Sequence, residues 1–135
     1  MLKFRKKNAF TLVEIIVTLA IVGTLAAIAY PRFMVTLEKM KAKEAEQNLI
    51  ALLSSQKRYS LENGGTYANA LADLDVEIRT LNEFGAPTIT SNAAELATFT
   101  RNAGSSFGTY SLTIDNTGII SCSGGAAGAC TQLGY

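Results

Sequence analysis

The stretch KKNAFTLVEIIVTLAIVGTLAAIAYPRF, residues 6–33, decides the fold of this chain. From Phe10 to Tyr30 it holds 21 residues, and Glu14 carries the only charged side chain among them. About 20 apolar residues in a helix suffice to cross the hydrocarbon core of a bilayer. A carboxylate at membrane depth costs about 2.5–3.5 kcal/mol, so the presence of Glu14 in this run requires an explanation.

The charges around the apolar run predict its orientation in a membrane. Four basic residues precede it, at positions 3, 5, 6 and 7, and the single Arg32 follows it. Such an asymmetry favours a cytoplasmic N-terminus, with the rest of the chain on the other side of the membrane. The formal net charge of the 135 residues is only +1, so the sequence predicts no general attraction to nucleic acid.

The composition also bounds the chemistry. The chain contains no His, which is the commonest general base and metal ligand in proteins. No nucleophile–base pair, phosphate-binding loop or cofactor motif is evident, so the sequence predicts neither an enzyme nor a cofactor. The spacing of Asp73, Asp75, Glu77 and Asp115 matches no complete calcium loop, and we expect no metal site.

Three interpretations of the apolar run are open. A secretory signal peptide fits the AIA pattern at residues 27–29, but its apolar region usually spans only about 7–15 residues. An uncleaved signal anchor accounts for the length and orientation of the run but not for Glu14. Cleavage between Ala9 and Phe10 would create a protonated α-amino group one helical turn from Glu14. In a bundle of staggered copies, that amine can pair with the carboxylate of a neighbour and fix the register.

The segment AFTLVEIIVTLAIVGTLAAIAYPRF resembles the N-terminus of type IV pilins and of the related pseudopilins. The resemblance implies a basic leader, residues 1–9, which a prepilin peptidase removes by cutting between Ala9 and Phe10. It also implies N-methylation of Phe10 and an assembly role for Glu14, paired with the Phe10 amine of another subunit. The family usually has Gly before the cut, where this chain has Ala9.

Gly23 and Pro31 also correspond to positions in the family pattern. Pro31 removes one backbone hydrogen bond of a helix, and Gly23 weakens the helix locally. The resemblance implies that the span between them unwinds when filaments stretch. In the single subunit we expect a continuous helix that carries a kink. The two residues are also common in ordinary membrane helices, which is the alternative interpretation.

The pattern becomes amphipathic between Phe33 and Leu61 and predicts that the helix continues. Asn63-Gly64-Gly65 is a strong signal for its end. The apolar stripe is predicted at spacings of three and four, and it comprises Phe33, Leu37, Met40, Ala42, Ala45, Leu49, Leu52 and Leu53. We expect a solvated face to carry Lys39, Lys41, Lys43, Glu44 and Glu46.

The sequence therefore predicts four segments: a leader over residues 1–9, an apolar helix over 10–31, an amphipathic continuation over 32–62, and a head over 63–135. In the head, alternation predicts strands over residues 94–102 and 108–115, and a third strand follows the DNTG turn at 115–118. The predicted fold class is α+β, with the long helix packed on a three- or four-stranded antiparallel sheet, as in type IV pilins.

Cys122 and Cys130 are eight residues apart in a Gly-rich span. Their spacing fits neither a zinc site nor a C-x-x-C redox motif. With the head outside the cytoplasm, a disulfide is favoured over two free thiols. The resemblance implies the same, because type IV pilins carry a C-terminal disulfide loop.

The resemblance implies a structural subunit that is processed, N-methylated and polymerised into a surface filament. Its partners would be other copies of the chain, the cytoplasmic membrane before assembly, the prepilin peptidase and the assembly machinery. A pseudopilin of a type II secretion system, whose filament stays periplasmic, and a minor pilin are the alternatives. A membrane-anchored or secreted enzyme or binding module is the alternative from a different class.

Overall fold

The computed structural model describes residues 10–135, so the predicted leader and the cut after Ala9 lie outside the described residues. Its longest element is helix α1, Leu12–Glu62, which runs for 51 residues. The chain divides into two units, one ending at Thr36 and the other spanning Leu37–Tyr135. Helix α1 contributes to both of them.

The first unit consists of the N-terminal part of α1. The helix continues through Pro31 without interruption, as the sequence predicts. The apolar part of α1 is long and fully exposed. By length and composition, this helix can cross a membrane.

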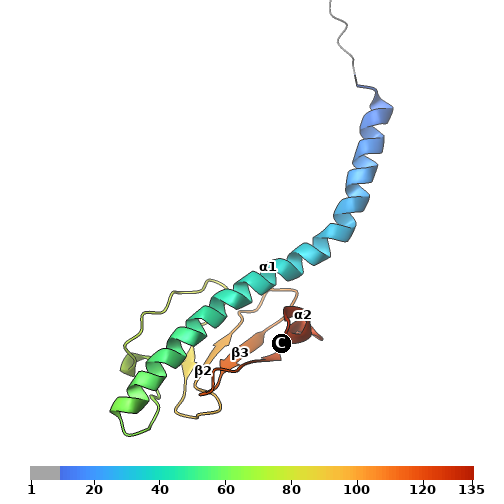
Figure 1. Cartoon of the computed structure of the whole chain (residues 1–135). Helices are drawn as coiled ribbons and strands as arrows, with labels where there is room; N and C mark the ends of the chain where they lie inside the picture. Colours follow the sequence, from blue (N-terminus) through green and yellow to red (C-terminus); the bar gives the residue numbers. More distant parts are fainter. Residues whose placement is uncertain (1–9) are drawn as a thin grey trace, which may run out of the picture. The chain divides into compact units, whose positions relative to one another are not determined.

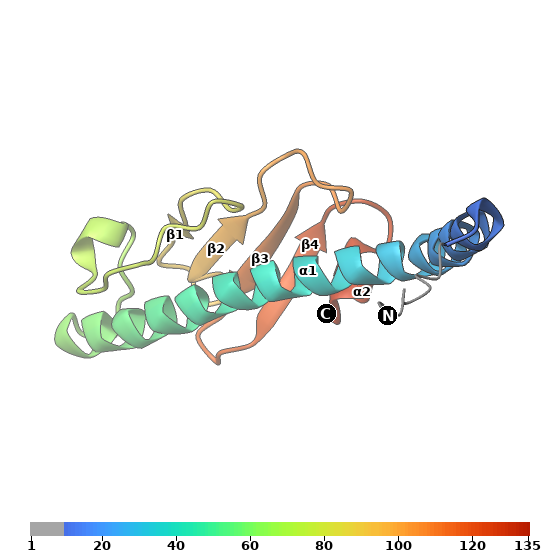
Figure 2. The same ribbon diagram turned by 90° about the horizontal axis from the view of Figure 1, so that it is seen from above.

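The second unit packs the rest of α1 against one face of a four-stranded sheet (Figures 1 and 2). The strands are β1 (Thr88–Ile89), β2 (Ala97–Thr100), β3 (Tyr110–Ile114) and β4 (Ile120–Gly124). All neighbours pair antiparallel in the order β1-β2-β3-β4. The predicted α+β architecture is confirmed, although the strand predicted over residues 94–102 is β2, which begins at Ala97 and ends at Thr100.

The core lies between α1 and this sheet. In β3 the side chains of Tyr110, Leu112 and Ile114 are buried, and Ser111 and Thr113 alternate with them on the outer face. Each large side chain that is buried in this way contributes about 1.5–3 kcal/mol to folding. The buried apolar residues of α1 in this core are Ala42, Ala45, Leu49, Leu52 and Leu53.

The apolar stripe of α1 differs from the prediction at its N-terminal end. Phe33 and Met40 are 58% and 65% exposed, and Leu37 is also exposed. The buried stripe instead begins at Glu38. Position 38 lies four residues before Ala42, so it shares the face that the sheet covers. The head thus buries a charged side chain where the sequence pattern predicts apolar ones.

The end of α1 is the one that the glycines predict. Gly64 and Gly65 have φ angles of 65° and 92°, in the left-handed region that glycine adopts without strain. The Gly65 N–H donates to the carbonyl of Ser60 at 2.8 Å, which caps a free carbonyl of the last turn.

The segment between α1 and β1 is held to the helix by polar side chains. The side-chain amide of Gln56 makes two hydrogen bonds to the backbone of Ala68, at 3.0 and 2.9 Å. Asn48 donates to the carbonyl of Arg79 at 2.9 Å. The short 3-10 helix η1 (Leu71–Asp73) lies in this segment. Among the apolar residues in and after η1, Leu74 is buried, and Leu71, Val76 and Ile78 are half-buried.

The C-terminal segment is closed by a disulfide between Cys122 and Cys130. The bridge joins β4 to the short helix α2 (Ala129–Leu133), whose residues Ala129 and Leu133 are buried. At Gly125, with a φ angle of 83°, an added Cβ would lie 2.9 Å from the Phe107 carbonyl oxygen. Only glycine therefore allows the bridged loop to pack this closely against the segment before β3.

Candidate assembly interface

The start of α1 is capped by a side chain. The Oγ1 atom of Thr11 accepts a hydrogen bond from the backbone N–H of Glu14 at 3.2 Å. Thr11 is therefore the N-cap residue, and Glu14 occupies the third helical position, as in the spacing of a capping box. Glu14 also lies in the first turn, where the helix dipole favours a negative charge.

This cap gives Glu14 a local role that the sequence analysis missed. The signal was present as TLVE at residues 11–14, in which Thr precedes Glu by three positions. The cap lowers the cost of a carboxylate at this position but does not neutralise its charge. Among residues 10–135, no ion pair involves Glu14.

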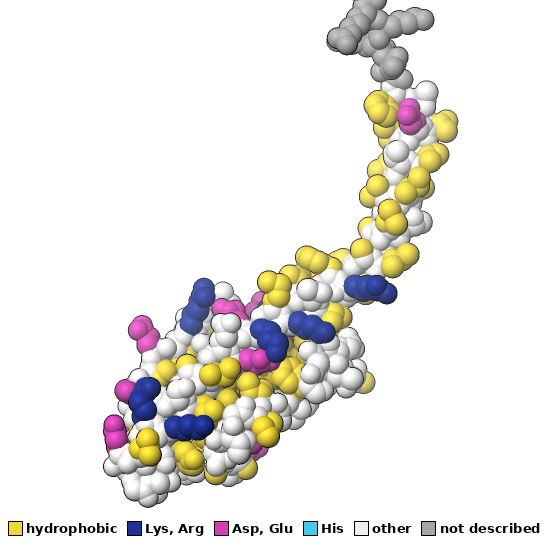
Figure 3. Space-filling view, viewed as in Figure 1, with side chains coloured by type: hydrophobic (Ala, Val, Ile, Leu, Met, Phe, Trp, Pro, Cys, Tyr) yellow, Lys and Arg dark blue, Asp and Glu magenta, His cyan; other side chains and the backbone are white. Residues whose placement is uncertain are grey.

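Apart from Glu14, the surface of the N-terminal part of α1 is almost entirely apolar (Figure 3). Every side chain from Phe10 to Phe33 is exposed. A continuous apolar surface of this extent is not stable in water and needs lipid or other protein chains to cover it. The large exposed side chains of this segment are Phe10, Leu12, Val13, Ile15, Ile16, Val17, Leu19, Ile21, Val22, Leu25, Ile28, Tyr30 and Phe33.

Two threonines in this apolar surface satisfy their hydroxyl groups within the helix. Thr18 donates to the carbonyl of Ile15, and Thr24 donates to that of Ile21, both at 2.8 Å. Hydroxyl groups that bond back to the preceding turn carry little desolvation cost into a membrane or a protein core. The carboxylate of Glu14 is then the polar group of this segment that gains most from a partner outside the chain.

The two predicted softening residues lie in regular helix. An added Cβ at Gly23 would meet no atom within 4 Å, so packing within the described chain does not require glycine there. Pro31 lies inside α1 and supplies no N–H for the helical ladder. The local softening of α1 by these two residues and their role in a filament both stay predictions.

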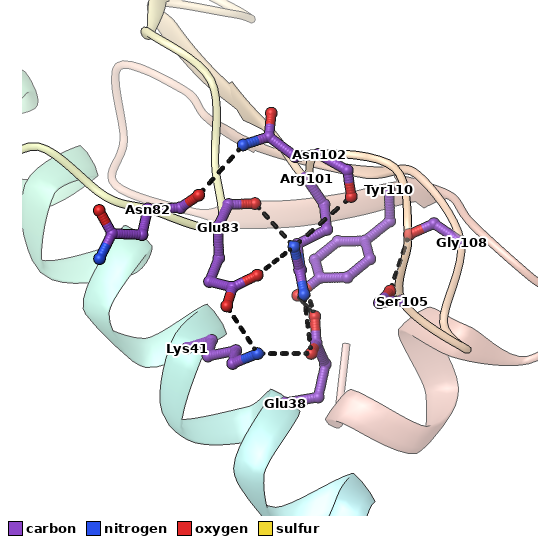
Figure 4. Close-up of polar contacts among 9 residues, drawn as sticks. All are labelled: Glu38, Lys41, Asn82, Glu83, Arg101, Asn102, Ser105, Gly108 and Tyr110. Carbon is purple, nitrogen blue, oxygen red and sulfur yellow. Dashed lines mark hydrogen bonds and ion pairs between the residues drawn. The ribbon is translucent and has the colours of Figure 1, made fainter.

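The second polar feature is a cluster of five residues that we call the Glu38 cluster (Figure 4). It joins α1 to β3 and to the chain segments that flank β1 and β2. Both Glu38 and Arg101 are buried, with 4% and 3% of their surface exposed. The members of the cluster are Glu38, Lys41, Glu83, Arg101 and Tyr110.

Glu38 is the centre of the cluster. Its Oε1 atom accepts hydrogen bonds from Arg101 Nε at 2.6 Å and from the Tyr110 hydroxyl at 2.9 Å. Its Oε2 atom lies 3.4 Å from Arg101 Nη2 and 3.9 Å from Lys41 Nζ. Both carboxylate oxygens therefore have partners, which a buried charge requires.

Arg101 and Lys41 also share a second carboxylate, that of Glu83. Arg101 Nη1 lies 2.8 Å from Glu83 Oε2, and Lys41 Nζ lies 3.1 Å from Glu83 Oε1. The cluster therefore contains two positive and two negative groups and is neutral as a whole. Glu38 and Arg101 are the buried charged members, and this neutrality limits the cost of removing their two charges from water.

The pKa values in the cluster follow from these contacts. Burial works against the charge on Arg101, but the hydrogen bond with Glu38 and the charges of Glu38 and Glu83 together raise its pKa. Burial, with the hydrogen bond to Glu38, raises the pKa of Tyr110 above its ordinary value. The hydrogen bond from Lys41 and the charge of Arg101 lower the pKa of Glu83.

Part of the helix face that was predicted to be solvated also contacts the rest of the head. Glu46 pairs with Lys43 at 2.9 Å and accepts a hydrogen bond from the hydroxyl of Tyr135. Lys43 Nζ lies 5.9 Å from the centre of the Tyr135 ring. Glu44 pairs with Arg79 at 3.8 Å, while Lys39 remains exposed. The charged residues of α1 thus bind the head as well as facing solvent.

Chemically, this arrangement suits assembly. Among residues 10–135 no group of three or more His, Cys, Asp or Glu side chains converges to hold a metal ion. The large apolar surface and the charge of Glu14 instead call for lipid or protein partners. The Glu38 cluster makes α1 and the sheet one body within the second unit.

Comparisons with known proteins agree with this interpretation. The model of the prokaryotic N-terminal methylation motif matches residues 4–30. The type IV major pilin protein PilA of Myxococcus xanthus is 43% identical over 61 residues, which is 44% of this chain and 28% of the pilin. The type II secretion system core protein G of Dickeya chrysanthemi is 37% identical over 59 residues, or 44% of this chain and 39% of that protein.

The core protein G of Escherichia coli is 36% identical over 58 residues, which is 43% of this chain and 40% of that protein. The matches thus span less than half the length of these relatives. No solved structure matches the chain significantly. The chain carries the prokaryotic N-terminal methylation motif of prepilins at the start of a long helix that packs on an antiparallel sheet, and it is similar to type IV pilins and to core protein G of type II secretion systems.

Proposed function

We propose that this chain is the structural subunit of a type IV pilus-like filament. The observation that carries the proposal is the exposed apolar surface of residues 10–33, which overlaps the methylation motif at residues 4–30 and contains the single acidic residue Glu14. In the precursor, lipid covers this surface. In the filament, the equivalent helices of other copies cover it, so the apolar surface never has to face water.

The proposed processing creates the partner of Glu14. A prepilin peptidase cuts between Ala9 and Phe10, and the new α-amino group of Phe10 is N-methylated. Removal of the leader also removes its four basic residues, which would otherwise have to enter the apolar core of the filament. The Phe10 amine of one subunit then pairs with the Glu14 carboxylate of a neighbour, and the pair fixes the stagger between copies.

The proposed topology follows the distribution of charge. Before assembly the precursor crosses the cytoplasmic membrane once, with residues 1–9 in the cytoplasm and the head on the other side. The disulfide between Cys122 and Cys130 is compatible with an oxidising compartment outside the cytoplasm. Assembly also requires machinery that extracts subunits from the membrane.

Residues 23–31 are the proposed soft segment of α1 in the filament. Because Pro31 lacks an N–H donor and Gly23 has a low helix propensity, this is where α1 unwinds at least cost under tension. The helix of the single subunit is continuous there, and we propose that unwinding occurs only in the assembled filament.

The experiment that tests processing is the intact mass and N-terminal sequence of the protein from its native membrane. A chain that begins at Phe10 and carries one added methyl group supports the proposal. A chain that begins after Ala29 identifies a signal peptide, and a chain that retains residues 1–9 identifies an uncleaved anchor. Each of the last two results would overturn the filament assignment.

A subunit of a type II secretion filament is the second candidate. It is favoured by the similarity to core protein G of several bacteria. Immunogold electron microscopy of intact cells separates the two candidates. Label on fibres that extend from the surface supports a pilus, whereas label only after the outer envelope is opened, with loss of protein secretion on gene deletion, supports the secretion filament.

A further inference from the structure

A shallow groove of about 610 Å³ lies between the segment that follows α1 and the turn that joins β1 to β2. Its volume is in the range of about 300–1,000 Å³ that is typical of small-molecule sites. We propose that this groove binds a neutral saccharide unit. The residues that line it are Gly65, Thr66, Tyr67, Asn69, Ser91 and Ala93.

The first wall of the groove is held in place before any ligand binds. Gln56 clamps Ala68 through two hydrogen bonds, and Ala68 lies between the lining residues Tyr67 and Asn69. The hydrogen bond from Gly65 to Ser60 fixes the start of the same wall. A wall that is already ordered spares a ligand the entropic cost of ordering it.

The second wall is tied to the first across the sequence. The N–H of Ser91 donates to Oδ1 of Asn69 at 2.9 Å, over a separation of 22 residues. The turn behind it is closed by Asn92, whose Oδ1 accepts the N–H of Ala94 at 3.1 Å. The carbonyl of Ala93 accepts from the N–H of Asn116 at 2.8 Å. Both walls are therefore anchored to the core of the head.

The polar groups of the groove match the hydroxyl groups of a sugar. The oxygen of Asn69 is occupied by Ser91, and because the side chain is exposed, its Nδ2 group is accessible as a donor. The hydroxyl of Thr66 donates to the carbonyl of Asn63 at 2.7 Å, so its oxygen remains an acceptor. Adjacent hydroxyl groups of a pyranose can accept from the first and donate to the second.

The remaining features of the groove favour a neutral pyranose. Half-buried Tyr67 offers an aromatic ring, whose face can cover the C–H groups of a sugar ring. The lining contains no charged side chain. An exposed acidic residue flanks each of the two segments. Glu62 precedes Gly65, and Glu95 follows Ala93. Their negative potential disfavours an anionic ligand.

The experiment is a ¹H–¹⁵N NMR titration of the full chain in micelles of a zwitterionic detergent without a sugar headgroup. The probes are the methyl glycosides of glucose, galactose, mannose and N-acetylglucosamine, with glucuronate as the anionic counterpart. We expect saturable shifts of the Gly65, Thr66 and Ser91 amides for at least one methyl glycoside. Because the groove is shallow, we expect a Kd on the order of 1 mM or weaker. Glucuronate should bind at least fivefold more weakly.

The decisive variant is Asn69→Asp. Aspartate keeps the oxygen that Ser91 requires but removes the Nδ2 donors, so binding should weaken at least fivefold while the spectrum of the free protein stays similar. Asn82→Asp is the matched control, because it adds the same charge at an exposed residue outside the groove, and it should leave binding unchanged. Tyr67→Ala should also weaken binding at least fivefold.

Three results would overturn the proposal: no saturable shift with any methyl glycoside, shifts confined to residues outside the groove, or equal weakening by Asn69→Asp and Asn82→Asp. A neutral Gly-Ser peptide that binds where no glycoside does would assign the groove to a different class of ligand and would also overturn it. Because the titration uses unassembled protein, its outcome is independent of whether the chain forms filaments.

Discussion

The guanidinium Nε of Arg101 lies 2.6 Å from the carboxylate oxygen Oε1 of Glu38, and both side chains are buried between α1 and the sheet. The two residues are 63 positions apart in the sequence. This contact and the hydrogen bond from the Tyr110 hydroxyl to Glu38 together fix which turn of α1 faces which strand. An apolar pair could slide along the helix face, whereas a buried charge pair loses its partners when it is displaced.

We expect Arg101→Ala to destabilise the head by about 3–5 kcal/mol, because it leaves the carboxylate of Glu38 buried without its main partner. Chemical unfolding of the full chain in micelles, followed by circular dichroism, measures the loss. Lys43→Ala is the control, since the Lys43 side chain is exposed and its ion pair with Glu46 should contribute less than about 1 kcal/mol. Equal losses in the two variants would contradict a special role for the buried pair.

Replacement of the acidic residue in the apolar segment separates membrane insertion from assembly. Glu14→Gln keeps the size of the side chain and removes its charge, so insertion should persist, while filament yield and N-methylation fall severalfold. Thr11→Ala is the control, because it removes the helix cap at a cost of about 1 kcal/mol but leaves the carboxylate in place. Electron microscopy and the intact mass of the mature chain are the measurements. Normal, methylated filaments from Glu14→Gln would exclude the proposed pairing with Phe10.

Loss of the disulfide should loosen the C-terminal segment. For a loop of this length, the chain-entropy model gives a stabilisation of roughly 2–3 kcal/mol, which Cys122→Ser should remove. The bridge joins β4 to α2, so we also expect faster amide exchange in α2 and weaker contact between Tyr135 and Glu46. Unfolding of the wild type with and without a reductant should reproduce the difference. A reductant that leaves the wild-type transition unchanged would rule out this contribution.

Tyr110 should make the head sensitive to alkali. Burial and the hydrogen bond to Glu38 raise the pKa of Tyr110 in the folded state, whereas in the unfolded chain it is about 10. The folded state therefore binds more protons above that pH, and its stability is complete below pH 10 and falls as the pH rises further. The tyrosinate absorbance and the free energy of unfolding, measured across this range, follow the effect.

Tyr110→Phe tests the assignment of that alkaline loss. It should cost about 0.5–1.5 kcal/mol at neutral pH through the lost hydrogen bond and should flatten the decline above pH 10. The pKa of Tyr135 is raised by burial and by its hydrogen bond to Glu46. Tyr135→Phe should therefore reduce the rest of the stability loss above pH 10. An unchanged alkaline slope in both variants would mean that other groups control it.

The parts of the fold that local patterns encode could be predicted from the sequence. The apolar run and the Asn63-Gly64-Gly65 stop signal defined α1, and alternation around Tyr110, Leu112 and Ile114 defined a strand. The strand β1 was missed because it has only two residues and follows a proline at position 87. A strand this short has no period that a pattern could reveal.

The Glu38 cluster could not be predicted, because its partners come from segments far apart in the chain. Lys41 was predicted to lie on a solvated helix face, and no local feature of the sequence pairs Glu38 with Arg101. One signal was available: position 38 continues the stripe of Ala42, Ala45 and Leu49 at a spacing of four. A charged residue on a stripe that becomes buried needs a partner of opposite charge.

The order of the strands has a consequence for how the head folds. Each strand pairs only with its neighbours in the sequence, so the sheet can form from local hairpins, which close quickly. The contacts of Glu38 with Arg101 and Tyr110 span 63 and 72 residues and can form only when α1 meets the finished sheet. Docking of the helix should therefore be the slow step of folding, and until then the sheet keeps an uncovered apolar face that a chaperone could recognise.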